Sequence, residues 1–350
     1  MSASKPLSYF SPGSRLGSCT IQRLIGRSRH AEVYRAFHSG LNQDVALKLL
    51  YPALPKTPEL RICFRDAVRA MMQLKHPNII RVFEFDASND QFYLVMELVE
   101  HTTLRDVIST HPTGLGRDDA LRIFGQIASA AAYAHDQQHV HGNIKPENVL
   151  IGADDRPVLM DFAIPCLADA AAAAPDAVLG APTYLAPEQI EQGLLSAQSD
   201  VYSLGILFYE LVTGEVPFKG ATREIVIRQH LTEPAPAPSQ LEVDLDPHIE
   251  QVILKALDKN PLARYETARE LLADLQHEEL VKQYDTLVFD READERVRKR
   301  RSEIMRFERS RLEGAAPHQE APEAPSRLPV LIGLVLILAV IAVVLAVLLL

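Results

Sequence analysis

Residues His141 to Leu150 read HGNIKPENVL, and the motifs on either side of this stretch decide the fold. The stretch carries two amides, Asn143 and Asn148, with the ammonium of Lys145 between them. An amide cannot take up a proton at neutral pH, so Asn143 is unsuited to act as a general base. Four more motifs follow in order: VLMDFA (158–163), APE (186–188), SDVYSLGILFYELVTG (199–214) and KNPLARY (259–265).

The sequence before this stretch shows strand and helix patterns. QDVALKLL (43–50) predicts a strand with Ala46 and Lys48 on one face and three aliphatic side chains on the other. Residues 117–140 place apolar side chains at helical spacing, with acids in the first turn. Three further motifs stand upstream: LIGRSRHAEVYRAF (24–37), RICFRDAVRAMMQLKHPNII (61–80) and FYLVMELVE (92–100).

The order and spacing of these motifs resemble a bacterial-type Ser/Thr protein kinase domain from about Arg15 to His277. The resemblance implies an α+β, two-lobed protein-kinase fold after a tail of residues 1–14. A small β-rich N-lobe is expected over about 15–98 and a larger helical C-lobe over about 99–277. Three matches support the fold rather than the chemistry: Glu188 and Arg264, which pair in the family, and Asp200, which braces the catalytic loop.

The resemblance also implies roles for residues of the cleft between the lobes. Lys48 is expected to contact the nucleotide phosphates and Lys145 to neutralise the transferred phosphoryl group. Asn148 and Asp161 match the two magnesium ligands, so ATP and Mg²⁺ are the implied cofactors. The remaining nucleotide-binding positions are Gly26, Val33 and Ala46, with the backbone groups of Glu97 and Val99.

The catalytic loop and its switch depart from the family pattern. Asn143 stands where the family has the aspartate that accepts the substrate proton. Gly142 replaces the arginine that, in the family, binds the phosphate group of a phosphorylated activation segment. That segment, Asp161 to Pro182, contains no Ser, Thr or Tyr. The hydroxyl that would be phosphorylated and the arginine that would bind its phosphate are therefore both missing.

Other departures affect the small lobe and the activation segment. The acid that would pair with Lys48 falls at Ala67. Asp66 lies one residue away, about 100° round a helix, and is a poor substitute unless the helix is rotated. Three smaller changes accompany this loss: Ser28 in the glycine-rich loop, Ala163 in D-F-G and Ala181 in the G-T-P element.

Together the losses predict a pseudokinase that binds nucleotide and signals or scaffolds through protein contacts, with an active kinase, a phosphatase or a client as partner. A general base contributes about 10²- to 10⁴-fold, so its loss alone need not abolish transfer. The alternative is therefore a weak Ser/Thr kinase that uses Lys48, Lys145, Asn148 and Asp161. A third interpretation, from fold analogy, is a different nucleotide-dependent transfer in the same cleft.

The C-terminal sequence predicts a membrane anchor. PVLIGLVLILAVIAVVLAVLLL (329–350) has no polar side chain and, at about 1.5 Å per residue, can span a hydrocarbon core of roughly 30 Å. Three arginines between 309 and 327 place residues 1–328 in the cytoplasm. We expect a tail-anchored protein of the inner (cytoplasmic) membrane. Two segments precede the anchor: a charged juxtamembrane helix over 278–313 and a Pro/Ala linker over 314–328.

Net charge and cysteine content indicate which kind of partner and which cellular compartment to expect. The net charge of −10 argues against nucleic acid as the main partner. The three cysteines are an odd number without metal-ligand spacing, which predicts reduced thiols in a cytosolic compartment.

Overall fold

The computed structural model describes residues 9–28, 31–50, 58–86, 92–162, 182–241 and 245–275. The chain divides into two units, Met1–Phe289 and Asp290–Leu350, and every described residue lies in the first. Ala163, Ala181 and the predicted juxtamembrane helix, linker and membrane span lie outside the described residues. Among the helices that are described, none is both long and apolar enough to cross a membrane.

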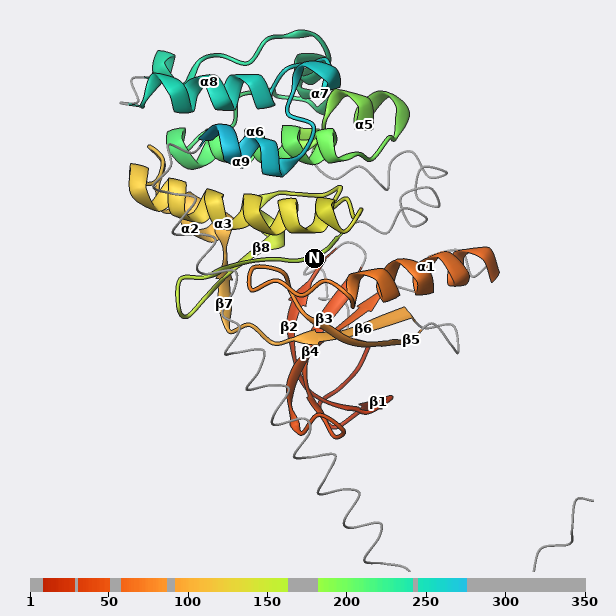
Figure 1. The fold of residues 1–350 in the computed structure, drawn as a ribbon. Helices are drawn as coiled ribbons and strands as arrows, with labels where there is room; N and C mark the ends of the chain where they lie inside the picture. The colour runs from red at the N-terminus through yellow and green to blue at the C-terminus, as the bar shows by residue number, and fades with distance from the viewer. Residues whose placement is uncertain are drawn as a thin grey trace, which may run out of the picture. The chain divides into compact units, whose positions relative to one another are not determined.

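The small lobe is an antiparallel sheet flanked by one helix (Figure 1). The helix α1 (Pro58–Met71) packs on the sheet through Phe64 and Val68, whose partners include Phe92 and Leu94. The sheet has the order β1-β2-β3-β4-β6-β5, with β1 at Arg15–Leu16, β2 at Cys19–Arg27, β3 at Ala31–His38, β4 at Gln43–Leu50, β5 at Val82–Asp86 and β6 at Phe92–Glu97.

The alternation predicted for residues 43–50 is present in β4. Val45, Leu47 and Leu49 are buried in a cluster with side chains of β2, β3 and β6. Ala46 lies on the opposite face, in a second cluster that reaches the large lobe. The period of two along the strand therefore turns Lys48 toward the cleft between the lobes.

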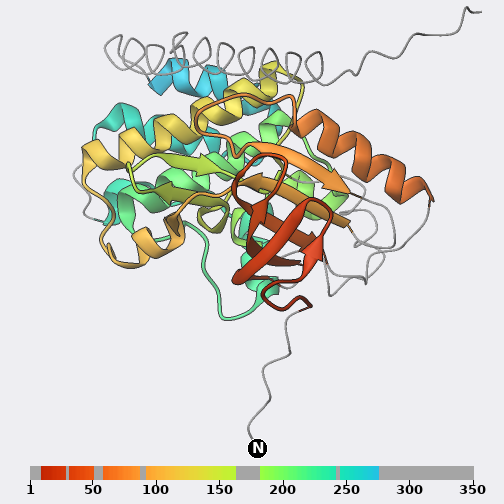
Figure 2. The same cartoon turned by 90° about the horizontal axis from the view of Figure 1, so that it is seen from below.

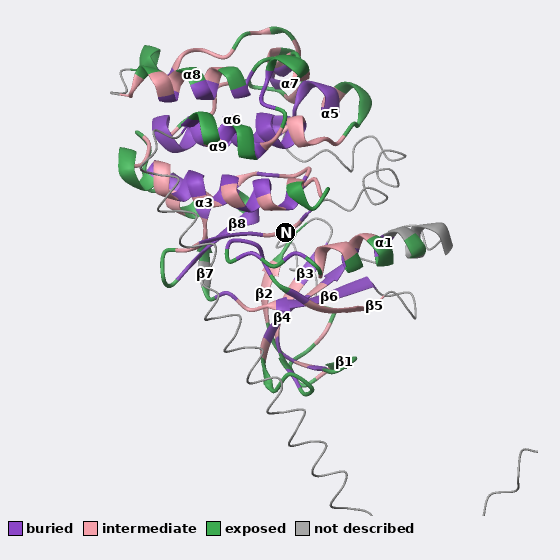
Figure 3. Ribbon diagram, in the orientation of Figure 1, coloured by how far each residue is buried: buried purple, intermediate pink, exposed green. Residues whose placement is uncertain are grey.

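The large lobe is built around the helices α3 (Arg117–Asp136) and α6 (Ala197–Thr213), each of which contributes buried side chains to its core (Figures 1 and 3). The rings of Phe124 and Phe208 stack with their centroids 3.9 Å apart. Helix α6 ends at Gly214, whose φ of +77° favours glycine. The other elements are the sheet β7 (His101–Thr103), β8 (Val149–Gly152) and β9 (Pro157–Leu159), the helices α2 (Leu104–Ser109), α5 (Pro187–Gln192), α7 (Arg223–Thr232), α8 (Pro247–Ala256) and α9 (Ala268–Leu275), and the 3₁₀ turns η1 (Pro146–Asn148), η2 (Pro182–Tyr184), η3 (Pro238–Leu241) and η4 (Pro261–Ala263).

A loop after α1 ties the small lobe to the large one. Asn78 donates its side-chain N–H to the carbonyl of Pro157 at 2.7 Å, and Ile79 forms a parallel bridge with Leu159 of β9. Figure 2 looks onto the small-lobe sheet, with α1 beside it and the large lobe behind. The position of α1 over the cleft is therefore fixed from the large lobe as well as from its own sheet.

The chain packs on the sheet before Arg15. Gly13 donates its backbone N–H to the carbonyl of Ile21 at 2.8 Å, and Ile21 donates to the carbonyl of Ser14 at 2.8 Å. Gly13 and Ser14, predicted as part of the tail, thus extend the pairing along β2.

Candidate functional site: the cleft between the lobes

An apolar cluster joins the two lobes and includes three of the predicted nucleotide-binding residues. The cluster lies beside the end of β6, so apolar side chains of both lobes meet there next to a strand backbone. Glu97, at that end, donates its backbone N–H to the carbonyl of Arg81 at 2.8 Å. The cluster comprises Ala46, Ile80, Met96, Val99, Leu150 and Val158, with Ile25, Val33, Leu98 and Met160 packed against it.

The glycine-rich loop is a hairpin between β2 and β3 in which Gly26 pairs with Val33. Ser28 closes this hairpin: its backbone N–H donates to the carbonyl of Ala31 at 2.8 Å, and its hydroxyl accepts from the Ala31 N–H at 3.0 Å. The serine that the sequence marks as a departure therefore adds a hydrogen bond across the turn. Residues 29–30, at the tip, lie outside the described part of the chain.

A buried acid next to this hairpin was not predicted from the sequence. Glu32 is 1% exposed and accepts hydrogen bonds from the guanidinium of Arg27 at 2.7 Å, the N–H of Tyr9 at 3.0 Å and the hydroxyl of Tyr34. Burial alone would raise the pKa of Glu32, but these three donors hold it below its ordinary value. The signal was its place in β3, on the same face as Tyr34.

Lys48 and Asp161 form a direct ion pair, with 2.6 Å between Nζ and Oδ1. Burial would raise the pKa of Asp161, but the charge of Lys48 and its hydrogen bond outweigh burial and lower the pKa. Lys145 also lowers it, which places this second ammonium within electrostatic reach. Asp161 has a φ of +63°, a left-handed conformation that aspartate tolerates better than most residues.

Among the described side chains of α1, neither Ala67 nor Asp66 offers Lys48 a carboxylate. Ala67 packs in the cluster that contains Leu94, the residue paired with Lys48 across β4 and β6. The side chain of Asp66 is 59% exposed and lies 3.5 Å from the guanidinium of Arg65. The helix is therefore not rotated to bring Asp66 inward, and Asp161 is the ion-pair partner that Lys48 has among the described residues.

Hydrogen bonds hold the catalytic loop in a fixed conformation. His141 accepts the N–H of Asn143 on Nδ1 at 3.2 Å, so its Nε2 donates to the carbonyl of Met160 at 3.0 Å. Burial lowers the pKa of His141, which keeps this ring neutral. Asn148 donates its side-chain N–H to the carbonyl of Asn143 at 2.8 Å. Because an amide is planar, its Oδ1 is directed away from that carbonyl.

Asp200 supports the same loop from below. This fully buried carboxylate accepts the N–H of His141 and the N–H of Gly142, both at 2.7 Å, and a hydrogen bond from His135 at 2.9 Å. Gly142 has a φ of +71°, which costs little for glycine and roughly 1–2 kcal/mol for a residue with a Cβ. Glycine at position 142 therefore avoids the backbone strain that a residue with a Cβ would carry in this conformation.

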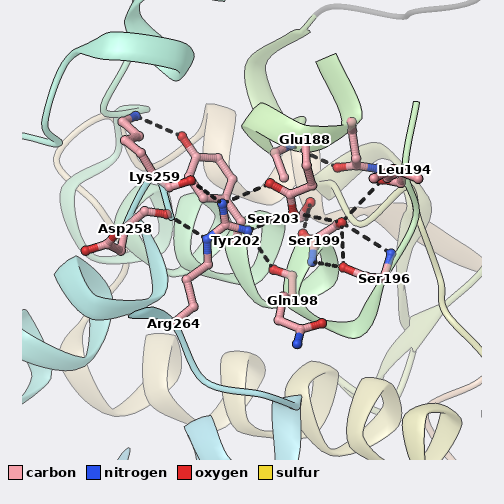
Figure 4. A network of polar contacts seen from close by, with 12 residues as sticks. Glu188, Leu194, Ser196, Gln198, Ser199, Tyr202, Ser203, Asp258, Lys259 and Arg264 are labelled. Carbon is pink, nitrogen blue, oxygen red and sulfur yellow. Dashed lines mark hydrogen bonds and ion pairs between the residues drawn. The ribbon is translucent and has the colours of Figure 1, made fainter. Parts of the chain in front are cut away.

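A second buried pair anchors the segment after the activation region (Figure 4). Arg264 donates to both carboxylate oxygens of Glu188, at 2.8 and 3.0 Å, and also to the backbone carbonyls of Asp258 and Gln198. Ser199 donates to the same carboxylate at 2.9 Å. The Glu188 pKa would be raised by burial, but the hydrogen bonds from Arg264 keep it low.

Arg105 of α2 makes a further network that sequence reasoning missed. Its guanidinium donates to Glu210 at 2.6 Å, Glu147 at 2.8 Å and the hydroxyl of Tyr184 at 2.5 Å. Its partners come from α6, η1 and η2, which lie far apart in the sequence, so no local pattern indicates it.

The two predicted magnesium ligands, Asn148 and Asp161, are linked by backbone hydrogen bonding. The Asn148 carbonyl accepts the N–H of Met160, the neighbour of Asp161, at 2.9 Å, while the Asn148 side chain donates to the catalytic loop. One carboxylate and one amide suit a magnesium ion that takes its other ligands from phosphate and water. Within the described residues, no group of three or more His, Cys, Asp or Glu forms a metal site of its own.

Comparisons with known proteins agree with this arrangement. Residues 19–285 match the protein kinase domain. The serine/threonine-protein kinase PrkC of Bacillus subtilis is 37% identical over 265 residues, which cover 75% of this chain and 41% of PrkC. PknB of Mycolicibacterium smegmatis is 37% identical over 259 residues, covering 72% of this chain and 41% of PknB.

The fold matches solved structures over the same region. The crystal structure of the Mycobacterium tuberculosis PknI kinase domain superimposes with a TM-score of 0.63 at 25% identity, covering 76% of this chain and 98% of that one. The matched region spans about two fifths of the length of the curated relatives. The chain belongs to the protein kinase domain family, with bacterial serine/threonine kinases among its relatives.

Proposed function

We propose that this chain is a membrane-anchored pseudokinase that binds a nucleotide in the cleft and acts through protein contacts. The observation that carries the proposal is Asn143, an amide at the base position of a loop otherwise held in place by His141, Asn148 and Asp200. An amide can orient a hydroxyl but cannot take its proton. The site therefore keeps its binding scaffold and lacks the group that would start transfer.

Two further features favour a complete loss of phosphoryl transfer over slow phosphoryl transfer. Ala67 stands at the α1 position of the acid that would pair with Lys48, and Asp66 beside it is exposed, whereas formation of that ion pair is required for kinase activity. Gly142 cannot bind a loop phosphate, and residues 161–182 contain no hydroxyl to carry one. Phosphorylation of that segment is thus no route to an active state.

A weakly active Ser/Thr kinase is the second candidate, favoured by retention of Lys48, Lys145, Asn148 and Asp161 and by the kinase names of the relatives. In that case magnesium held by Asn148 and Asp161 would neutralise charge on the phosphates. Lys145, whose charge lowers the pKa of Asp161, would stabilise the transferred group.

A phosphotransfer assay distinguishes the two candidates. The purified chain is incubated with labelled ATP, Mg²⁺ and a basic protein substrate, beside Asp161→Ala. We expect equal background labelling of both proteins. Labelling that Asp161→Ala abolishes would establish the weak kinase. Asn143→Asp alone is expected to remain inactive, because Ala67 still leaves Lys48 without its helix partner.

The remaining parts of the proposal concern location and partners. Residues 329–350 anchor the chain in the cytoplasmic membrane, and the kinase-like domain recruits an active kinase, a phosphatase or a client there. Deletion of 329–350 should move the protein from the membrane to the soluble fraction of lysed cells. Unchanged membrane association after the deletion would contradict the anchor.

A further inference from the structure

The charge balance of the cleft differs from that of an active kinase. Among the described residues predicted to contact the phosphates and the metal, two carry ammonium groups, Lys48 and Lys145, and one carries a carboxylate, Asp161, which pairs with Lys48 at 2.6 Å. The two other positions that carry acids in the family hold Ala67 and Asn143. The excess charge is therefore positive here, whereas two additional carboxylates would make it negative.

This balance decides what a polyphosphate needs in order to bind. A nucleoside triphosphate brings several negative charges, and a negative cleft accepts it only with divalent cations that neutralise them. A cleft with an excess of ammonium groups attracts the same phosphates directly. Loss of the two acids thus removes the electrostatic reason for a metal ion.

The ammonium of Lys48 competes with a metal ion for the carboxylate of Asp161. Asp161 is the sole carboxylate of the predicted ligand pair, and its Oδ1 lies 2.6 Å from the Lys48 ammonium. Magnesium binds mainly through carboxylates and phosphates. With alanine at position 67, where the family has the acid that holds this lysine, a metal ion at Asp161 has to share the carboxylate with the Lys48 ammonium or displace it.

We propose that this cleft binds nucleoside di- or triphosphates without a divalent cation, with Lys48 and Lys145 supplying the positive charge. The inference rests on the nucleotide binding proposed above and specifies its ligand as the metal-free nucleotide.

Titration calorimetry of the full-length chain with ATP tests this, once with EDTA and once with Mg²⁺. The expected Kd is the same in both within about threefold, since the chain supplies the charge itself. Binding at least tenfold tighter with Mg²⁺ would overturn this inference and leave the proposed pseudokinase intact. Absence of binding in both buffers would overturn this inference and the nucleotide-binding part of the proposed function.

Variants that restore a carboxylate should restore the need for metal. Asn143→Asp adds one negative charge without a change of shape, and we expect about tenfold weaker binding in EDTA that Mg²⁺ recovers. Ala67→Glu should act in the same direction, with Ala67→Gln as its neutral control of equal size. Asp66→Asn, which removes an exposed carboxylate on α1, should change neither titration. Equal Kd values in EDTA and Mg²⁺ for both acidic variants would contradict the electrostatic explanation.

Discussion

Replacement of Arg264 by methionine isolates the contribution of one buried ion pair. The Arg264 side chain is 0% exposed and that of Glu188 10%, and two hydrogen bonds join them. Removal of one partner from such a pair leaves a buried charge and costs roughly 3–5 kcal/mol. For a domain of this size each kcal/mol shifts Tm by about 2–4 °C, so Arg264→Met should lower Tm by roughly 6–20 °C.

The pH dependence of this variant has a definite sign. Arg264 holds the pKa of Glu188 below its ordinary value, so the pair stabilises the wild type above that value and is lost as pH falls through the lowered pKa. In Arg264→Met, burial is opposed by the hydrogen bonds from Ser199 and the backbone but no longer by Arg264, so the pKa of Glu188 is higher than in the wild type. Protonation of Glu188 then begins at a higher pH in the variant, and its stability deficit shrinks as pH falls from neutral.

Differential scanning fluorimetry at pH 7 and pH 5 measures both effects. The control is Arg122→Met, which breaks an exposed pair with Asp119 at 3.1 Å and should cost less than about 1 kcal/mol. The reasoning is refuted if Arg264→Met shifts Tm no more than Arg122→Met, or if its deficit at pH 5 equals that at pH 7.

Three other predictions concern stability. Gly142→Ala places a Cβ on a residue with φ of +71° and should cost roughly 1–2 kcal/mol in urea denaturation; a neutral result would contradict the strain argument. Asp200→Asn keeps one acceptor but turns an amide N–H toward a backbone N–H of the catalytic loop, so we expect a loss of about 1–3 kcal/mol and a higher Kd for ATP. Burial lowers the pKa of His76 to about 4, so the unfolded chain binds a proton that the folded chain does not, and stability should fall between pH 6.5 and pH 4. His76→Gln should flatten that slope in urea titrations, whereas His111→Gln, at an exposed position, should leave it unchanged.

Motif order predicted the two-lobed fold because each motif marks an element with a fixed place along the chain. The alternation of 43–50 and the left-handed end of α6 at Gly214 were predictable for a local reason: strand period and helix termination depend on neighbouring residues. The rotation of α1 about its axis was not predictable from the sequence, because it depends on how the helix packs against the sheet. In the structure this rotation leaves Asp66 exposed to solvent.

The electrostatics of the cleft were less predictable for the same reason. Sequence comparison indicates that Lys48 lacks its acid on α1, but not which group replaces it, because the partner comes from the far side of the cleft. The burial of Glu32 likewise depends on Tyr9 and Arg27, which approach it only in the folded sheet. Long-range pairs of this kind leave no periodic trace in the sequence.

The left-handed backbone at Gly142 has a consequence for which residues this position accepts. An arginine at position 142 would have to adopt this left-handed conformation and would therefore destabilise the domain. Residues 161–182 contain no hydroxyl group, so the arginine would find no phosphorylated side chain in that segment to bind. The backbone conformation at position 142 therefore favours glycine for the stability of the fold, whatever the activity of the loop.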